Sequence, residues 1–134
     1  MANLLVIAGN TALKAAWSEG MVLGKTFRYQ GEKMLDYLLS IIEKEKPEVL
    51  TIASVYKVSR EEEDLLRKEC SHLIILDINH TKYLLKYNLP ESLSYDRAAG
   101  IIAARYLFKD KACSIFNLGS TLTIDFIETD GSYS

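Results

Sequence analysis

The sequence has little of what several classes of protein require. It contains two cysteines, two histidines and two prolines. Cys70 and Cys113 are far apart in apolar surroundings and obey no metal-binding spacing, so we expect reduced thiols and no disulfide framework. His72 and His80 are too few and too widely spaced to form a metal site. This cysteine usage fits a reducing compartment, and we expect a cytoplasmic protein.

The sequence also lacks an excess of positive charge and a long run of hydrophobic residues. The formal net charge is −2 and the pI is near 5.7, which removes the simplest electrostatic case for nucleic-acid binding. The apolar start of the chain is much shorter than the roughly 20 residues of a membrane span, and no basic segment precedes it. We therefore expect neither nucleic acid nor a membrane as a partner.

The composition is ordinary for a folded domain. The chain has 134 residues, of which 49% are hydrophobic and 25% charged. That balance is too apolar for a disordered protein. The length suffices for one compact domain and leaves no room for a second complete one.

Apolar runs separated by turn residues predict a mixed order of strands and helices. Three strands joined as two hairpins come first, followed by helix, strand, helix, strand and helix, and then by two strands around a tight turn. Residues 77–93 are expected to be mostly irregular, and connections of this length usually carry function. Strands are predicted at residues 3–8, 13–17, 21–29, 49–55, 73–76, 112–116 and 121–127, and helices at 31–46, 59–70 and 94–108.

Two serines mark predicted helix starts. Ser59 precedes Glu62 with the spacing of a capping box. Ser94 stands where it can cap an alanine-rich helix.

This element order predicts a fold class. Three hairpin-connected strands followed by alternating helices and strands are typical of a ribonuclease-H-like α/β lobe with a mixed sheet flanked by helices. The last hairpin repeats the opening motif of an apolar strand, a glycine turn and a second strand. We therefore expect residues 1–110 to form an N-terminal lobe, and residues 111–134 to form the opening hairpin of a second lobe.

Two glycine turns are candidate phosphate-binding loops. Gly9, Asn10 and Thr11 form the first turn, with Lys14 shortly after it. Glycine allows close backbone approach, amides and hydroxyls donate hydrogen bonds, and lysine supplies charge. The second turn consists of Gly119, Ser120 and Thr121. For each turn, the alternative is a plain tight turn with no ligand. Two such turns at matching positions indicate phosphate binding more strongly than either turn alone.

Asp96 and Arg97 are the strongest candidates for direct chemistry. A carboxylate can accept a hydroxyl proton, and the adjacent guanidinium can bind an anionic substrate. The alternative is that Asp96 only stabilises the first turn of a helix. The tyrosines of the long connection could line a ligand site or pack as half-buried side chains; they are Tyr83, Tyr87 and Tyr95.

Together these motifs resemble the first half of a type III pantothenate kinase, a family of the actin-like ATPase superfamily. The resemblance covers essentially the whole chain, in the family's order and spacing. The matching segments are Gly9-Asn10-Thr11 with Lys14, Ser54-Val55, Tyr87-x-x-Pro90-x-x-Leu93-x-x-Asp96-Arg97-x-Ala99 and Asn117-x-Gly119-Ser120-x-x-Thr123-Ile124-Asp125.

The resemblance implies a function and a set of residue roles. The family transfers the γ-phosphate of ATP to pantothenate, toward coenzyme A, using Mg²⁺ and a monovalent cation (K⁺ or NH₄⁺) in homodimers. Asp96 would be the general base, while Arg97 and Tyr87 would bind the substrate. The two glycine turns and Lys14 would contact the phosphates of ATP, which agrees with a reaction that depends on positioning and charge neutralisation.

The chain departs from the family pattern where charge matters most. The family has aspartates at the positions of Ile7 and Asn117, beside the metal and the phosphates. It has glycine at Ser94, and usually Thr-Ala where this chain has Ser120 and Thr121. Neither Ile7 nor Asn117 supplies the charged oxygen that Mg²⁺ prefers, so we expect no metal ligands here and an inactive or incomplete enzyme. A chain ending before the family's glycine pair fits that expectation. The alternative is a non-catalytic binding or oligomerisation module, comparable to transcription accessory factors similar to this family.

Overall fold

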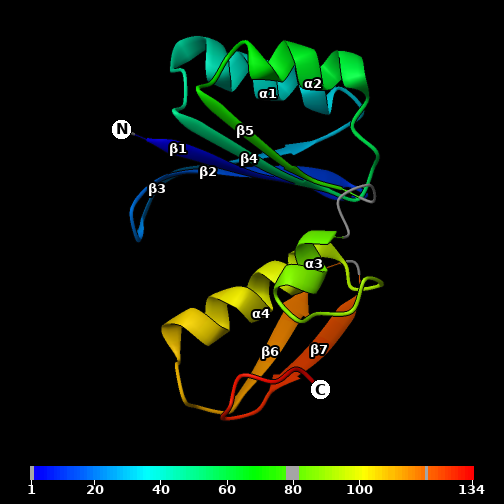
Figure 1. The fold of residues 1–134 in the computed structure, drawn as a ribbon. Coiled ribbons are helices and arrows are strands. Elements are labelled where there is room, and N and C mark those ends of the chain that lie inside the picture. Colours follow the sequence, from blue (N-terminus) through cyan, green and yellow to red (C-terminus); the bar gives the residue numbers. More distant parts are fainter. Residues whose placement is uncertain (1, 78–81, 120) are drawn as a thin grey trace. The chain divides into compact units, whose positions relative to one another are not determined.

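The computed structural model describes residues 2–77, 82–119 and 121–134 (Figure 1). The chain forms two compact units, unit 1 (Met1–His80) and unit 2 (Thr81–Ser134). Each unit is described by itself below. No helix among the described residues is long and apolar enough to cross a membrane.

Unit 1 is built on a five-stranded mixed sheet. Its strand order is β3-β2-β1-β4-β5, with β1 antiparallel to β2, β2 antiparallel to β3, and β1, β4 and β5 parallel. The strands β1 and β4 alternate between buried and more exposed positions, which gives the sheet one core face. This confirms the predicted mixed sheet. The strands are β1 (Asn3–Ala8), β2 (Ala12–Glu19), β3 (Val22–Gln30), β4 (Val49–Ser54) and β5 (His72–Leu76).

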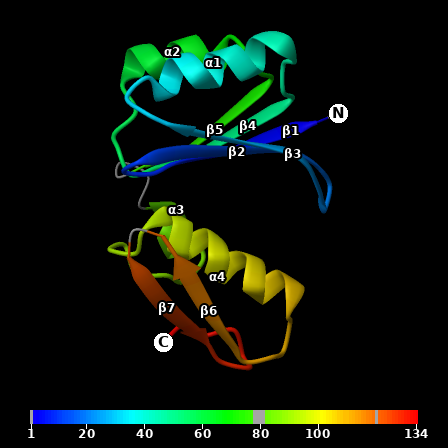
Figure 2. The same cartoon turned by 180° about the vertical axis from the view of Figure 1, so that it is seen from behind.

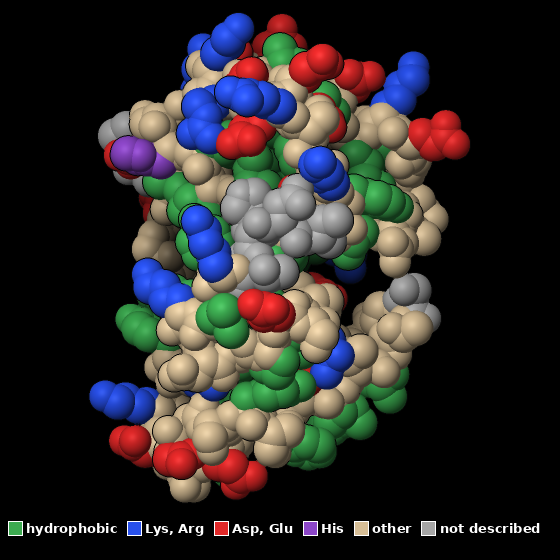
Figure 3. Space-filling model, turned by 45° about the vertical axis from the view of Figure 1, so that its right-hand side comes forward, with side chains coloured by type: hydrophobic (Ala, Val, Ile, Leu, Met, Phe, Trp, Pro, Cys, Tyr) green, Lys and Arg blue, Asp and Glu red, His purple; other side chains and the backbone are tan. Residues whose placement is uncertain are grey.

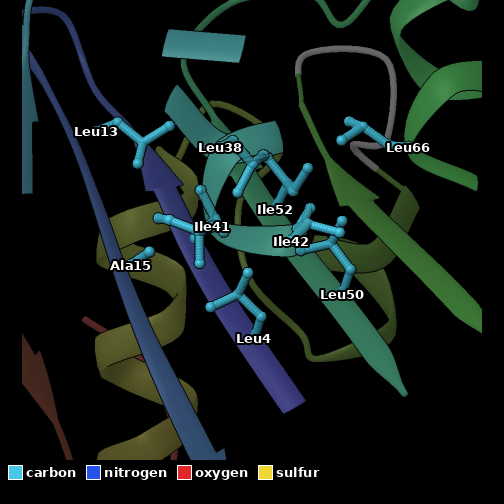
Figure 4. Packing of buried hydrophobic residues seen from close by; sticks show 10 residues of the cluster. Leu4, Leu13, Ala15, Leu38, Ile41, Ile42, Leu50, Ile52 and Leu66 are labelled. Carbon is cyan, nitrogen blue, oxygen red and sulfur yellow. The ribbon is translucent and has the colours of Figure 1, made fainter. Parts of the chain in front are cut away.

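Two helices, α1 (Met34–Lys44) and α2 (Arg60–Arg67), cover the same face of this sheet (Figures 1 and 2). Helix α1 is amphipathic and ends before Pro47, as its pattern predicted. The capping box of α2 is confirmed, because Glu62 N donates to Ser59 Oγ and Ser59 N donates to Glu62 Oε1, both at 3.2 Å. The two helices and the sheet bury one apolar core (Figure 4), formed by Leu4, Val6, Leu13, Ala15, Leu38, Ile41, Ile42, Leu50, Ile52 and Leu66.

Parallel strands place their carboxyl ends at one edge of the sheet. The strands β1, β4 and β5 end there at Ala8, Ser54 and Leu76. Ligands of open α/β sheets commonly bind beyond this edge. The turn from β1 to β2 lies at this edge and carries the first candidate phosphate loop.

Unit 2 consists of a short helix, a long helix and a hairpin. Helix α4 packs on one face of the hairpin of β6 and β7. Its small buried residues Ala98 and Ala104 allow close approach, and Ile101 fills the apolar cluster between the helix and the hairpin. The elements are α3 (Lys82–Lys86), α4 (Tyr95–Leu107), β6 (Cys113–Leu118) and β7 (Leu122–Ile127).

The described residues of 77–93 are mostly irregular, as expected, with one short helix that the sequence did not predict. This segment contains α3, which ends in a Schellman motif at Asn88, where φ is 56°. Leu89 N donates to Leu84 O at 2.9 Å, and Asn88 N donates to Leu85 O at 3.0 Å. Leu84 and Leu89 are both buried, so this short helix is held by packing and by its end rather than by its length.

The structure corrects the expected cap at Ser94. It occupies the N-cap position of α4 as expected, and its carbonyl accepts from Ala98 N at 2.9 Å. Its side chain forms no capping hydrogen bond.

The boundary between the compact units falls between residues 80 and 81. Helix α4 and the hairpin both lie in unit 2, and the expected lobe boundary at residue 110 stays a prediction. The interpretation of residues 111–134 as the start of a second lobe concerns the architecture of a longer protein, and it stays a prediction.

Candidate functional site

The first candidate phosphate loop is an ordered turn in unit 1. Gly9 N donates to Ala12 O at 3.0 Å, which closes the turn. The hydroxyl of Tyr56 donates to Asn10 O at 3.1 Å and so ties the turn to the segment after β4. Asn10 and Thr11 are exposed, so their polar groups are open to a ligand. A cavity of about 440 Å³ lies beside the turn, lined among others by Asn10, Ser54 and Tyr56.

Lys14 and Ile7 stand directly opposite each other on β2 and β1. Both are exposed, and both belong to the face of the sheet that α1 and α2 leave open. Ile7 is 44% exposed although it is apolar. A carboxylate at position 7 would lie beside Lys14, close to the candidate phosphate turn, whereas the isoleucine gives Lys14 no charged neighbour at that position.

The second candidate loop is the turn between β6 and β7 in unit 2. Gly119 N donates to Thr121 O at 3.2 Å, and both residues are exposed. The remaining predicted residue of this loop, Ser120, lies outside the described residues. The two glycine turns therefore share an exposed position after an apolar strand and a glycine amide that hydrogen-bonds within the turn.

Asn117 precedes this turn on the face of the hairpin that α4 covers. Its Nδ2 atom and the Oγ1 atom of its cross-strand partner Thr123 are buried, and neither has a hydrogen-bond partner among the described residues. The close approach of Gly100 brings the helix backbone near, since an added Cβ there would lie 3.3 Å from Ile115 Cγ2 and 4.0 Å from Asn117 Nδ2. Each unsatisfied buried group costs about 1–3 kcal/mol, so this pair lowers the stability of unit 2.

Asp96 and Arg97 occupy the first turn of α4 but face different surroundings. Consecutive helix residues are separated by roughly 100° around the axis. Asp96 is exposed, whereas Arg97 turns toward β7. The structure therefore separates the predicted base from the predicted anion-binding group by direction, although the two are adjacent in sequence.

Arg97 forms a bidentate ion pair with Asp125 of β7. Arg97 Nε donates to Oδ2 at 3.0 Å, and Nη2 donates to Oδ1 at 2.6 Å. The hydroxyl of Tyr133 donates to Oδ1 at 2.7 Å, and Arg97 Nη2 also reaches the Tyr133 oxygen at 3.4 Å. Asp125 has no exposed side-chain surface, while the side chain of Arg97 is 29% exposed.

These contacts fix the charge states of the cluster. The hydrogen bonds from Arg97 lower the pKa of Asp125, although burial acts in the opposite direction, and the Tyr133 hydroxyl contributes further. The hydrogen bond to Asp125 raises the pKa of Arg97. The same carboxylate, followed by burial, raises the pKa of Tyr133. An ionised Asp125 is therefore held between a permanent cation and a neutral phenol.

Tyr87 follows α3 and is tied to α4 by its backbone. Arg105 Nη1 donates to Tyr87 O at 2.6 Å, while Arg105 Nε donates to Gly131 O at 2.7 Å. The Tyr87 side chain is 42% exposed. Its ring is therefore free to meet a ligand while its backbone is anchored.

The two positions where the family pattern has aspartates beside the metal do not fit Mg²⁺. Ile7 offers no ligand atom, and the Asn117 amide nitrogen is a donor buried against α4. Across residues 2–77, 82–119 and 121–134, no three His, Cys, Asp or Glu side chains gather closely enough to hold a metal ion.

The sequence motifs did not reveal the roles of Asp125 and Tyr133. A signal for Asp125 was present, because strand alternation places it with Ile127 on the buried face of β7. A carboxylate on a buried face requires a partner. The identity of that partner depends on how α4 packs, which the pattern did not give.

The fold and the turns define the class of the protein. A mixed sheet of this order, with a glycine turn after its first strand, is a lobe of the actin-like ATPase fold. The structure resembles a glucokinase from Balamuthia mandrillaris solved in complex with glucose, with a TM-score of 0.53 and 9% identity, over 99% of this chain and 46% of that one. At this identity the likeness concerns the fold alone.

Sequence comparison then identifies the family. The sequence model of the type III pantothenate kinase family matches residues 3–134, and the chain belongs to this family. A type III pantothenate kinase of Azobacteroides pseudotrichonymphae genomovar. CFP2 is 30% identical over 97% of this chain and 53% of its own length. One from Bacteroides fragilis (strain YCH46) is 28% identical over 98% of this chain and 54% of its own. The chain thus spans about half the length of these relatives.

The ion pair predicts a dependence of stability on acid. The folded-state pKa of Asp125 lies below its ordinary value of 3.8. Its contribution is therefore complete above about pH 4 and is lost as the pH falls through the folded-state pKa. Urea titrations followed by the amide NMR signals of α4 should show a loss of stability between pH 5 and pH 2 of about 1.4 kcal/mol per unit of pKa shift.

The matched comparison uses two asparagine variants. Asp125→Asn should weaken unit 2 at neutral pH and remove most of this acid dependence. Asp110→Asn should change little, because Asp110 is exposed and its φ of 64° suits asparagine. Equal acid dependence in the wild type and Asp125→Asn would contradict the assignment.

Proposed function

We propose that this chain carries substrate- and phosphate-binding elements of an ATP-dependent pantothenate kinase, the activity that forms 4′-phosphopantothenate for coenzyme A in the cytoplasm. ATP would be the phosphate donor and pantothenate the acceptor. Asp96 would act as the general base, with Arg97 and Tyr87 contacting pantothenate. The two glycine turns, residues 9–11 and 119–121, and Lys14 would face the phosphates of ATP.

One observation carries this proposal. The family match extends over residues 3–134, so it includes both glycine turns and the Asp96-Arg97 segment. The exposure of Asn10, Thr11 and Asp96 supports these roles, because groups that meet a ligand must be accessible.

We propose further that this chain binds its ligands but transfers phosphate poorly. Phosphoryl transfer depends on neutralising the charge of the γ-phosphate with a metal ion and cations. Ile7 and Asn117 stand at two places where carboxylates would hold that metal. Their presence also favours the second candidate function, a non-catalytic binding or oligomerisation module.

A coupled ATP–pantothenate assay tests the activity. We expect the chain to show turnover at background level, with a full-length curated relative as the positive control. Ile7→Asp should strengthen Mg²⁺-dependent ATP binding in calorimetry by about tenfold, the equivalent of about 1.4 kcal/mol. Adding Asn117→Asp should increase this further, because metal would compensate a carboxylate that is otherwise buried without a partner.

The matched control is Leu5→Asp, which places the same charge on the same face of β1, away from the turn. It should leave ATP binding unchanged. Ordinary turnover by the unmodified chain would overturn the proposal of poor transfer. Equal effects of Leu5→Asp and Ile7→Asp would overturn the assigned position of the first phosphate loop.

We also propose that the chain forms a homodimer through the outer face of its hairpin. Helix α4 covers one face of the hairpin, and the other exposes large apolar side chains at 42–83%. Hydrophobic side chains are visible at the surface of unit 2 in Figure 3. The face carries no charge, so an identical copy of itself is a chemically matched partner. It consists of Ser114, Phe116, Leu118, Leu122, Ile124 and Phe126.

Light scattering with size-exclusion chromatography tests this interface. The wild type should have twice the monomer mass of 15.1 kDa at micromolar concentration. Phe116→Lys, next to Ile124 across the hairpin, should give monomers because the buried face would gain a charge. Val22→Lys is the control, since Val22 is also exposed but lies on β3. A monomeric wild type, or dissociation by Val22→Lys alone, would contradict the proposal.

A further inference from the structure

Asp125 is buried and ionised but has no part in the proposed function. It lies on β7 with no exposed side-chain surface, and its two carboxylate oxygens accept from Arg97 and Tyr133. Its partner Arg97 is the group proposed to meet the substrate. Asp125 can therefore influence substrate binding without touching the substrate.

The geometry determines which part of the guanidinium is available. A guanidinium can bind carboxylates along its side, through Nε and Nη2, or at its end, through the two Nη atoms. Asp125 occupies the side edge, at 3.0 and 2.6 Å. Nη1 takes no part in these bonds, and the arginine side chain remains 29% exposed. An incoming anion must meet the end that carries Nη1.

Tyr133 strengthens this arrangement from a second direction. It belongs to the final segment, which pairs with β7 through the bridge between Ile127 and Tyr133. Its hydroxyl donates to Asp125 Oδ1 at 2.7 Å and accepts from Arg97 Nη2 at 3.4 Å. Three elements thus fix one arginine before any ligand arrives. This removes rotamer freedom that a flexible arginine would otherwise lose on binding.

We propose that Asp125, together with Tyr133, is a positioning residue that presents the Nη1 end of Arg97 to the carboxylate of the substrate. This inference rests on the proposed binding of pantothenate by this chain. Because the Arg97–Asp125 pair is neutral as a whole, it attracts anions in general only weakly, and selectivity comes from the fixed direction of the donor. A purely structural ion pair would change stability without changing ligand preference.

Calorimetry with two ligands separates these possibilities. One ligand is pantothenate, and the other is its analogue with a primary alcohol in place of the carboxylate. The wild type should bind pantothenate about tenfold more tightly, a ratio that one charge-assisted hydrogen bond supports. Asp125→Asn keeps the shape but loses the charge, so this ratio should fall to about one while binding of the alcohol stays unchanged.

Two further variants keep the test interpretable. Tyr133→Phe retains the ring and removes only the hydroxyl that bonds Asp125 and Arg97, so it should reduce the ratio part of the way. This variant serves in place of Asp125→Asn if circular dichroism shows Asp125→Asn to be unfolded. Asp110→Asn removes an exposed carboxylate of the same unit and should keep the full ratio.

The outcomes distinguish the inference from the proposed function. A retained preference in Asp125→Asn, or in Tyr133→Phe where that variant replaces it, would overturn the positioning role and leave pantothenate binding intact. Tighter pantothenate binding in these variants would also overturn it, because Asp125 would then be a competitor for Arg97. Equal affinities of the wild type for the two ligands would overturn it as well. A wild type that binds neither ligand would overturn the proposed function and the inference with it.

Discussion

The side-on ion pair between Arg97 and Asp125 is the interaction on which the organisation of unit 2 depends. A two-stranded hairpin has little stability of its own, and α4 covers only one of its faces. The ion pair joins the first turn of α4 to β7, and Tyr133 adds the final segment. Because Arg97 is held toward the hairpin, Asp96 is left exposed on a different side of the helix. A structural contact thereby sets the directions of the residues proposed to meet the substrate.

Each unit has candidate binding elements, and charges expected from the family pattern are missing from both. In unit 1, an exposed glycine turn lies at the carboxyl edge of parallel strands, and Ile7 stands opposite Lys14 where the family pattern has an aspartate. In unit 2, Asn117 leaves an amide nitrogen buried without a partner among the described residues. Positioning groups and charge-neutralising groups are separable parts of a phosphoryl-transfer site. The chain has kept candidates for the positioning groups while the expected metal-binding carboxylates are absent.

Much of the fold was predictable because local patterns agree with packing. Apolar runs bounded by turn residues predicted the strands, and the capping box at Ser59 predicted the start of α2. Helix α3 was missed because five residues carry too little periodicity, and only its left-handed end at Asn88 had a sequence signal. The absence of a side-chain cap at Ser94 was also beyond the pattern. The partner of Asp125 lies 28 positions away, and identifying it required the packing of α4 on the hairpin.

The most direct test of the account is the state of the Arg97 side chain in the free protein. Side-chain NMR of arginine-labelled protein, with the signal assigned through an Arg97 variant, reports whether the Nε proton is held in a hydrogen bond. The account predicts a slowly exchanging Nε signal at neutral pH that persists when pantothenate is added, while only the Nη signals move. An Nε proton that exchanges like that of a free arginine, or that is displaced by pantothenate, would contradict it.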